Sequence, residues 1–406
     1  MIECQFDIHP IGQGLFYTGQ IGDFFFVYDC GSSRYHEYRQ AAVNRTIQKN
    51  QIINLFVLSH FHEDHFNGLS DILDQTENIR EIVLPYLHPD QRILLALQQA
   101  ISSGHLENEY IQFLRSPHDF IGERLRETQI TYLIPDDPVV EWPEDPDDRN
   151  EGQGWIPNSN PLTEHETFEV VNKNVRYRKH SSIYQHYLWK FKFYCAHPKA
   201  DPQMFKNFIH EIESKHTPIE ESLLENFDEI KQLYLDTFGE GAPQNSTSIL
   251  CCHGPVAQKH IKHPVAHSLE IMGCHSVSNM RYPYPFLTFI PRSHPLLVPD
   301  YFCSINMHML TGDAEICVDD LEQHFKPELH RIMCLLIPHH GSKSNWRRKF
   351  LDLMPHCLFW AASFGLGNTH KHPSGAVMKD IHQHSRVFMP CNECHGIRIS
   401  QTIVPL

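Results

Sequence analysis

The sequence predicts an α/β protein, and three observations carry that prediction. Residues 52–87 read as a buried strand, a short helical segment and a second strand, which is the element order of α/β sheets. Strand-like runs return in the final quarter of the chain. The chain has 406 residues, of which 41% are hydrophobic, so it can bury a large core as one big domain or two ordinary ones.

Apolar patterns in the first part of the chain define the expected elements. Residues 4–30 alternate and then run apolar, with glycines marking turns, which indicates a pair of strands ending at Asp29. A polar segment over 35–50 is compatible with a helix. The next expected elements are a buried strand over 52–60, a short helix over 69–75, a strand over 80–87 and a helix over 90–101.

The middle of the chain is less regular. An acidic stretch punctuated by prolines, 135–154, predicts a solvated loop, and residues 253–300 predict another loop region rich in His, Pro and aromatic residues. The expected elements are a strand over 187–195, two helices within 202–238 that break near Pro218, and strands over 245–252, 303–313, 331–342, 357–365 and 386–391.

Charge and hydropathy narrow the class of partner. The formal net charge is −15, which opposes non-specific attraction to nucleic acid, so a polyphosphate substrate would need local positive charge from metal ions or a basic patch. No segment offers the roughly 18 apolar residues of a spanning helix, and the first residues carry neither a basic leader nor an apolar signal core. We therefore expect no membrane association and a cytoplasmic location.

Cysteine usage fits reduced thiols. The twelve cysteines are scattered through strand-like runs instead of being spaced like a disulfide framework. Cys391, Cys394 and His395 match the haem-attachment pattern, but that chemistry belongs to exported proteins, and no second CxxC completes a zinc knuckle. A structural role for these residues is favoured.

The segment "LSHFHEDHFNGL", residues 58–69, concentrates metal-binding side chains after a buried strand. Its H-x-H-x-D-H spacing lets His60 and His62 share one metal while Asp64 and His65 turn toward a neighbouring one, and these ligands suit zinc, manganese or iron. The chain has 31 histidines, so a polar loop that is merely rich in histidine is the competing interpretation. The spacing favours metal binding.

This motif resembles that of the metallo-β-lactamase superfamily, whose members carry it in the loop after a strand of an αββα sandwich. Further residues match in order: Asp29 stands where members have an aspartate that supports the metal loop, and Asp313 in "LTGDAE" where a carboxylate bridges two metals. His339 and His340 in "PHHGS" correspond to the late histidine of the second metal, which leaves open which of the two is the ligand. The resemblance implies two divalent ions, Zn²⁺ or Mn²⁺.

Five short motifs resemble a particular branch, the soluble domain of the DNA-uptake competence protein and its stand-alone relatives. They are "GQG" near the amino terminus, "NSTSIL", "TGD", "PHHGS" and "GLGNTHKHP" over 365–373. That branch is regarded as metal-dependent nucleases or phosphodiesterases. The resemblance implies one domain over 1–406, with insertions without a family match at about 85–244 (helical, with the acidic loop) and 253–300.

One departure concerns the first metal. Many superfamily members supply a third histidine from a central strand, which here reads "NSTSILCCHG". Asn245 or Ser248 takes that place, or His253 does so from the far end of the strand, and the first option is favoured. A first metal held only by His60, His62 and Asp313 would be open and would suit manganese as well as zinc.

These residues suggest a hydrolytic mechanism. Two divalent ions would lower the pKa of a bridging water, so that hydroxide attacks phosphorus and the metals neutralise the developing charge. Whichever of the histidine pair is not a ligand, or His372, would protonate the leaving oxygen or contact phosphate, and Ser342 and Lys343 could bind phosphate oxygens. The competing interpretations are a structural hydrogen bond for His372 and a solvated loop residue for Lys343. The expected metal ligands are His60, His62, Asp64, His65, Asp313 and His339, and the expected catalytic residues are Asp64, His340, His372 and Lys343.

Three functions follow from this interpretation. The first is a phosphodiesterase or nuclease, with basic residues at 176–180, 189–193 and 347–349 as candidate nucleic-acid contacts, although a solvated face is the favoured interpretation of such charge runs. The second is a hydrolase of a small ester, lactone or cyclic nucleotide, which the acidic composition suits better. The third is a subunit controlled by a protein partner, with the insertions as docking surface, in a larger assembly such as a bacterial defence system. The sequence gives no oligomeric state.

Overall fold

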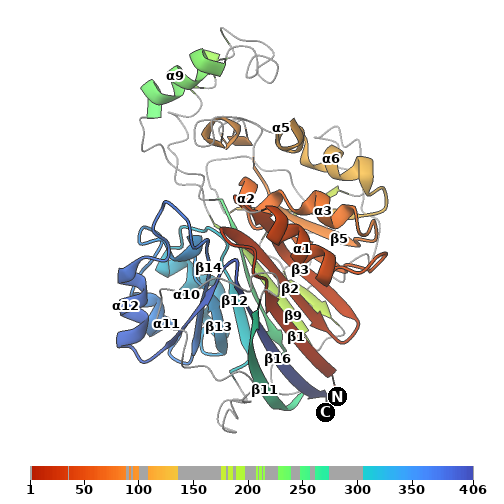
Figure 1. Ribbon diagram of the computed structural model, residues 1–406, viewed down its shortest axis with the longest axis vertical. Coiled ribbons are helices and arrows are strands. Elements are labelled where there is room, and N and C mark those ends of the chain that lie inside the picture. The colour runs from red at the N-terminus through yellow and green to blue at the C-terminus, as the bar shows by residue number, and fades with distance from the viewer. Residues whose placement is uncertain are drawn as a thin grey trace.

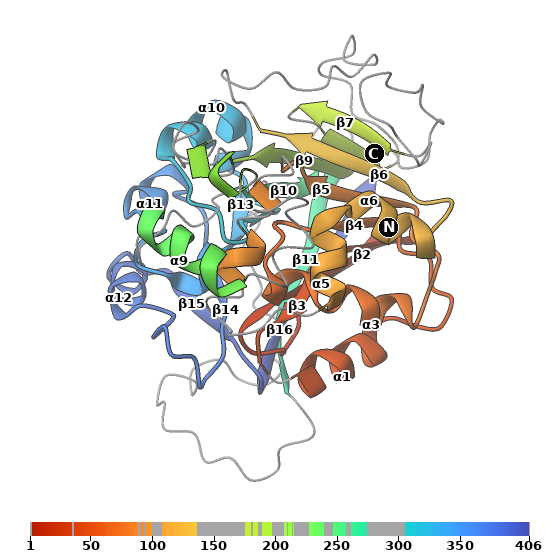
Figure 2. The ribbon, with the colours of Figure 1, turned by 90° about the horizontal axis from the view of Figure 1, so that it is seen from above.

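Two β-sheets face each other and carry helices on their outer sides, as Figures 1 and 2 show from two directions. The computed structural model describes residues 2–34, 36–87, 91–92, 95–99, 108–135, 175–179, 182–185, 189–196, 207–208, 210–212, 214, 227–238, 247–256, 261–273 and 305–405. The expected αββα sandwich is therefore confirmed.

The first sheet has nine strands. In spatial order they are β11 (Ile261–Gly273), β16 (His395–Pro405), β1 (Ile2–Ile8), β2 (Gly14–Ile21), β3 (Phe24–Ser32), β4 (Leu55–Val57), β5 (Glu81–Pro85), β6 (Gln129–Ile134) and β7 (Val175–Lys179). The pairs from β11 to β3 are antiparallel, and those from β3 to β7 are parallel. Chain ends that are far apart in sequence thus lie side by side in β1 and β16.

The second sheet has seven strands. Their order is β15 (Val387–Cys391), β14 (Phe359–Ser363), β13 (Ile332–Leu336), β12 (Met307–Leu310), β10 (Ile249–Pro255), β9 (Trp189–Cys195) and β8 (Ser182–Gln185). Strands β12 to β15 are parallel, so the loops that follow β12 and β13 leave the sheet at the same edge. Loops at such an edge are where α/β folds place functional side chains.

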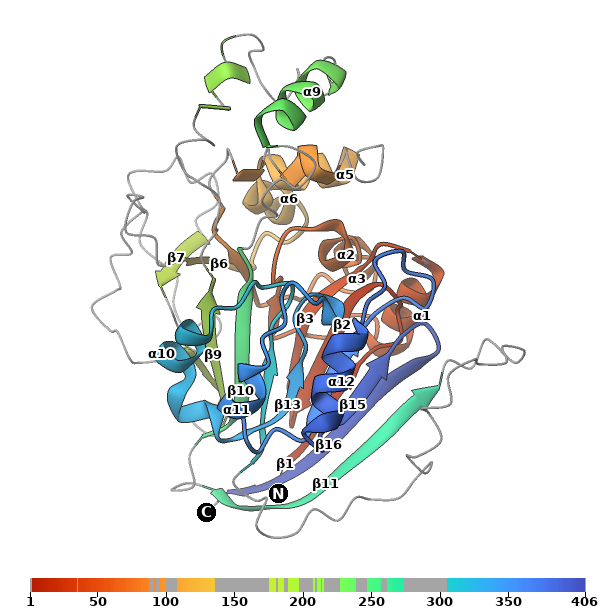
Figure 3. The same ribbon diagram turned by 90° about the vertical axis from the view of Figure 1, so that its left-hand side faces the viewer.

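Helices cover the two outer faces. Next to the first sheet are α1 (His36–Thr46), α2 (Glu63–Phe66), α3 (Leu69–Leu73), α5 (Asn108–Arg115) and α6 (Pro117–Arg124). Next to the second are α10 (Val318–Leu329), α11 (Lys349–Leu353) and α12 (Gly375–Gln383), with the 3₁₀ turn η4 (His339–Gly341) after β13. Figures 1 and 3 place α5, α6 and α9 (Phe227–Phe238) over the end of the sandwich that carries α2. Among the described residues, no helix is both long and apolar enough to cross a lipid bilayer.

Three apolar layers hold these elements together, one between the sheets and one under the helices of each face. Aromatic rings fill the layer between the sheets: Phe6 stacks on Trp189 with centroids 5.4 Å apart, and Phe26 meets Phe191 edge-on at 4.9 Å. Lys190 and Lys192 alternate with these rings and bond Glu328 of α10 at 3.2 and 3.1 Å. The alternation of basic and aromatic residues in 189–193 thus reflects a strand with one buried face.

The prediction for residues 253–300 was wrong in part, because 261–273 form β11 at the edge of the larger sheet, pairing with β16. Pro264 and the polar residues of β11 hid this strand, and the register shifts between Lys262 and Ala266, where an edge strand tolerates proline. The stretch 85–244 likewise contributes β6 to β9 to the two sheets, so it is more than a helical and acidic insertion. The acidic loop predicted over 135–154 lies, apart from residue 135, outside the described residues.

The "CNECH" segment has a structural role. The Cys391 thiol is buried and donates to the carbonyls of Ile8 at 3.6 Å and His9 at 3.2 Å. The Glu393 carboxylate accepts the backbone N–H of Leu366 at 3.0 Å. These contacts tie the carboxy-terminal loops to the first strands of the larger sheet.

A buried histidine near β2 predicts an acid-sensitive contribution to stability. His9 stacks on Phe16 at 4.2 Å and shares a hydrogen bond of 2.8 Å with the Thr18 hydroxyl. Burial, opposed by Asp7, lowers the pKa of its imidazole to about 4. Between pH 6.5 and 4, His9 is protonated in the unfolded chain, where its pKa is near 6.5, but stays neutral in the folded chain. The contribution of neutral His9 to the free energy of unfolding is therefore complete above pH 7 and is lost as the pH falls toward 4.

We expect His9→Gln to make the unfolding free energy of the metal-free protein less steep between pH 4.5 and 6.5, by up to about 1.4 kcal/mol per pH unit. Urea unfolding at several pH values measures that slope. His382→Gln on the exposed side of α12 is the matched control and should keep the wild-type slope. An unchanged slope in His9→Gln would contradict the assignment.

Candidate metal centre

The H-x-H-x-D-H segment follows β4 and runs into the start of α2, and Asp29, three residues before the end of β3, fixes its position. The Asp29 carboxylate is fully buried and accepts three hydrogen bonds: from the Ser59 N–H at 2.6 Å, the Ser59 hydroxyl at 2.6 Å and His65 Nδ1 at 2.7 Å. Asp29 itself has a left-handed backbone with φ 57°, a conformation that aspartate tolerates better than most residues. Asp29 thus holds the loop in the way the resemblance implies.

Two glycines let the main chain of the metal loop lie directly on the sheet. A Cβ atom at Gly31 would lie 2.5 Å from the backbone carbon of Asp64, and one at Gly14 would lie 2.7 Å from its carbonyl oxygen. Any side chain at either position would push Asp64 and His65 away from the sheet. The "GQG" and "DCG" segments therefore matter because of this close approach.

The second half of the centre comes from the loops after β12 and β13. Asp313 follows β12, and His339 and His340 form η4 after β13. Both histidines have left-handed backbones, with φ 49° and 54°, a conformation that costs roughly 1–2 kcal/mol per residue without glycine. Two such residues in a row, at a site of clustered imidazoles, persist only where the surrounding structure holds the backbone in place.

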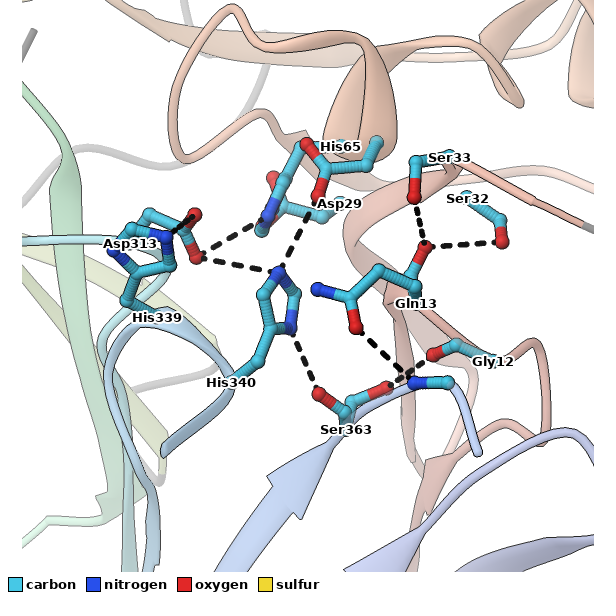
Figure 4. Close-up of polar contacts among 12 residues, drawn as sticks. Gly12, Gln13, Asp29, Ser32, Ser33, His65, Asp313, His339, His340 and Ser363 are labelled. Carbon is cyan, nitrogen blue, oxygen red and sulfur yellow. Dashed lines mark hydrogen bonds and ion pairs between the residues drawn. The ribbon is translucent and has the colours of Figure 1, made fainter. Parts of the chain in front are cut away.

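The Asp313 carboxylate lies at the middle of the cluster and presents one oxygen to each side. Its Oδ2 lies 3.7 Å from Nε2 of both His60 and His339. Its Oδ1 lies 3.4 Å from Nε2 of His65 and 3.7 Å from Nε2 of His340. Figure 4 shows Asp313 with His65, His339 and His340 around it. This arrangement fits a carboxylate shared between two cations.

Among the described residues, three overlapping groups have ligand atoms within 4.8 Å of one another: His60, His62 and Asp64; His60, His65 and Asp313; and Asp64, His65 and His340. His340 Nε2 also lies 3.3 Å from Asp64 Oδ2. The structure therefore brings His340, the histidine expected to be catalytic, into the group with Asp64 and His65. His339, the expected ligand, belongs to none of these three groups, and the carboxylate that its Nε2 faces is that of Asp313 at 3.7 Å.

Hydrogen bonds at Nδ1 fix which ring nitrogen of each histidine carries the proton. His65 Nδ1 faces the Asp29 carboxylate, and His340 Nδ1 faces the Ser363 carbonyl at 2.8 Å, so both nitrogens must donate. His60 Nδ1 lies 3.0 Å from the Ser59 hydroxyl, whose own proton goes to Asp29, so it donates as well. Whenever these rings are neutral, as ligands of a metal must be, the lone pair is therefore on Nε2.

These lone pairs point at carboxylate oxygens, and a proton or a cation must lie between. Nε2 of His60, His65 and His340 and Oδ1 of Asp313 are buried without a hydrogen-bond partner among the described residues. Buried polar atoms of native proteins are almost always paired. Imidazole nitrogen and carboxylate oxygen are the ligand types of zinc and manganese, and their second nitrogens are oriented as in metal sites. The cluster thus fits a divalent metal centre.

The carboxylates of the cluster also favour bound positive charge, as the pKa shifts of its side chains indicate. Burial opposes ionisation of Asp313, but His339, His340, His65 and His60 lower the pKa of its carboxyl well below the usual range. Burial opposes protonation of His65, but Asp29, Asp313 and Asp64 raise the pKa of its imidazole well above the usual range. Burial lowers the pKa of both His60 and His62, which favours their neutral, ligating form.

The structure excludes one of the three candidates for a third ligand of the first metal. His253 is excluded, because it lies in the layer between the sheets, 3.0 Å from the Tyr17 hydroxyl and stacked on His308 at 5.0 Å. Ser248 is buried at the site edge, and its hydroxyl lies 2.7 Å from where a Cβ of Gly312 would stand. Asn245 lies outside the described residues.

The remaining candidates lie at the rim. The His372 ring is half-buried with its centroid 5.6 Å from that of His339, and burial together with His339, His340 and His370 lowers its pKa to about 4. It is therefore neutral at pH 7, which does not suit a proton donor. Lys343 is exposed, and Ser342 is buried with its hydroxyl 2.7 Å from that of Ser344.

Three supporting residues were not predicted: Ser59, Ser363 and Asn345. Ser59 stands directly before the metal motif and Asn345 stands in "HHGSKSN", so proximity to the motifs was the available signal. Ser363 lies at the end of β14, and no sequence pattern relates it to His340. Its role depends on the parallel pairing of β13 and β14.

No family model matches the chain, and no curated protein matches it. Among solved structures, it is similar to the metallo-beta-lactamase fold protein YhfI from Bacillus subtilis, with a TM-score of 0.37 and 6% identity over 98% of this chain and 99% of that chain. A likeness of that size carries no functional argument. The chain itself has two facing sheets with helices outside them and a histidine and aspartate cluster at the sheet edge, which is the αββα architecture that the resemblance to the metallo-β-lactamase superfamily implies.

Proposed function

We propose that this protein is a hydrolase that uses two divalent ions and acts on phosphodiesters. The observation that carries the proposal is the Asp313 carboxylate, whose two oxygens face separate imidazoles with fixed lone pairs. Asp64, His65 and His340 would hold one ion on the buried side. His60 and His62 would hold the other, with Asp313, whose Oδ2 lies 3.7 Å from His60 Nε2. A pair of divalent ions supplies Lewis acidity and lowers the pKa of water to near neutrality.

The residues of the chain have separate tasks in this scheme. Asp29 and Ser363 keep Nδ1 of His65 and His340 protonated, so that their Nε2 atoms stay free to bind. Lys343 is exposed just beyond the histidine pair and would hold a phosphoryl oxygen. His372 would act as a neutral hydrogen-bond partner of substrate, because its pKa of about 4 leaves it uncharged.

A phosphodiester is the preferred substrate because it is negatively charged and a centre with two divalent cations would be positively charged. The developing charge of phosphoryl transfer is spread over oxygens that cations stabilise well. The net charge of −15 favours a second candidate, a small ester, lactone or cyclic nucleotide, over long nucleic acid. A cytoplasmic location and a single domain are further parts of the proposal, and control by a protein partner is a third candidate.

The test combines metal analysis with hydrolysis. The purified protein, loaded with Mn²⁺ or Zn²⁺, is incubated with labelled DNA, labelled RNA, bis(p-nitrophenyl) phosphate and a lactone. Asp64→Ala with His65→Ala should abolish activity, whereas His382→Ala, far along α12, should not. Equal activity in the double variant would remove the enzyme hypothesis.

Salt dependence then separates the two substrate classes. Cleavage of nucleic acid should weaken steeply between 50 and 200 mM salt, on the order of 10³-fold if several phosphates are contacted. Hydrolysis of a small molecule should change little over the same range. Activity on the lactone alone would replace the phosphodiester assignment.

A further inference from the structure

The two adjacent histidines after β13 face different oxygens of Asp313. His340 Nε2 faces Oδ1 and Asp64, on the side of His65. His339 Nε2 faces Oδ2, the oxygen that His60 also faces, at the same distance of 3.7 Å. In Figure 4, His339 lies against Asp313 and His340 lies below it. The pair therefore divides between the two sides of the centre.

We propose that His339 is the third imidazole of the first metal, in place of the histidine that other members supply from a central strand. This inference rests on the proposed metal-dependent function. The side chain of the central-strand candidate His253 is buried in the layer between the sheets and cannot contribute. The first metal would then be held by His60, His62 and His339, with Asp313 shared between the two.

The side-chain amide of Asn345 fixes the orientation of the His339 ring. Its Nδ2 donates to the carbonyls of Asp313 at 3.3 Å and Ala314 at 3.2 Å, so its oxygen must be the atom that faces His339. That oxygen lies 3.2 Å from His339 Nδ1 and also accepts the Ser344 hydroxyl at 2.8 Å. His339 Nδ1 must therefore donate, which leaves Nε2 as a lone pair.

The lone pair of His339 meets an anionic oxygen, and a shared cation satisfies both. Two ligands bound to zinc at about 2.1 Å with a tetrahedral angle lie about 3.4 Å apart. The 3.7 Å between His339 Nε2 and Asp313 Oδ2 is within a few tenths of an ångström of that spacing. Hydrogen bonding of the other ring nitrogen by a side-chain carbonyl is the usual support of a ligating histidine.

The backbone of the pair explains how both rings reach one carboxylate. In an extended strand, successive side chains point to opposite faces. With both residues left-handed, at φ 49° and 54°, the His339 and His340 rings stay 6.0 Å apart at 75° to each other. The His339 side chain is 23% exposed against 4% for His340, so the first metal would be the one nearer to solvent.

The experiment measures binding of Zn²⁺ and Co²⁺ to the full-length protein after chelator treatment, by calorimetry, metal analysis and the visible spectrum of Co²⁺. The wild type should bind two ions. His339→Ala should bind the first ion at least about 10- to 100-fold more weakly and keep the second, and Asn345→Ala should weaken the first ion by a similar factor while leaving all ligands in place. His340→Ala should weaken the other ion.

His370→Ala is the matched control, because it removes a neighbouring imidazole that stacks on His372 and faces neither carboxylate oxygen among the described contacts. It should bind two ions with wild-type affinity. Two tight ions in both His339→Ala and Asn345→Ala would overturn this inference and leave the proposed function intact. A wild-type protein that binds no ion would overturn the proposed function itself.

Discussion

Asp313→Asn should remove at least one bound ion. It should also raise the activation free energy of hydrolysis by about 4 kcal/mol, which slows the reaction on the order of 10³-fold. The reason is geometric, since Asp313 places one anionic oxygen on each side of the centre and its side chain is only 11% exposed. An asparagine has one neutral oxygen and one N–H₂ group, so on one side it presents hydrogens to the lone pairs of imidazoles. The variant would therefore leave the chain with less negative charge to hold the proposed ions.

Metal analysis of the purified variant and its rate on bis(p-nitrophenyl) phosphate measure both effects. Glu322→Gln provides a control for loss of a carboxylate, because Glu322 lies on α10 in an exposed ion pair with Lys349 at 3.9 Å. It should keep two ions and the wild-type rate. If Asp313→Asn kept two ions, the shared carboxylate would have to be a different residue.

The first half of the centre could be predicted from sequence because its ligands lie on one short segment. His60, His62, Asp64 and His65 are close in space simply because a strand ends and a turn begins there. The spacing alone then specifies which side chains meet. Asp313 was found through a motif shared with a family, and its distance from the first segment follows from the pairing of the sheets.

The separate roles of His339 and His340 could not be predicted in the same way. Which ring faces which oxygen depends on two consecutive left-handed residues and on Asn345 and Ser363, which bond the two Nδ1 atoms. Sequence patterns report burial and periodicity, and neither contains these dihedral angles. Two adjacent polar residues show no hydrophobic periodicity, so the sequence does not predict where each side chain points.

Local sequence patterns likewise predicted some strands of the two sheets and missed others. The strand β9 was predicted well because its rings alternate with lysines, one face buried and one face bonded to α10. The edge strand β11 was missed because an edge strand needs neither alternation nor a continuous apolar run, and it is defined by its pairing with β16 at the other end of the chain. Partners far apart in sequence leave no local pattern.

Asp29→Ala should lower the unfolding free energy by about 3–5 kcal/mol and weaken binding of the metal that His65 holds by about 10- to 100-fold. Asp29 is fully buried and accepts from the Ser59 backbone, the Ser59 hydroxyl and His65 Nδ1. Alanine leaves all three donors without a partner and also strains the left-handed backbone at φ 57°. Asp29→Asn keeps the backbone preference and one acceptor, so it should cost less stability and still weaken the metal.

Chemical denaturation of the metal-free variants, followed by metal titration, separates these two effects. Asp7→Asn is the matched control, because Asp7 is a buried carboxylate of β1 that bonds Arg398 on β16 at 2.8 Å through both oxygens, away from the centre. It should lose stability and keep wild-type metal affinity, because it changes the sheet without touching His65. Wild-type affinity in both Asp29 variants would mean that the orientation of His65 comes from packing of the metal loop on Gly14 and Gly31 alone.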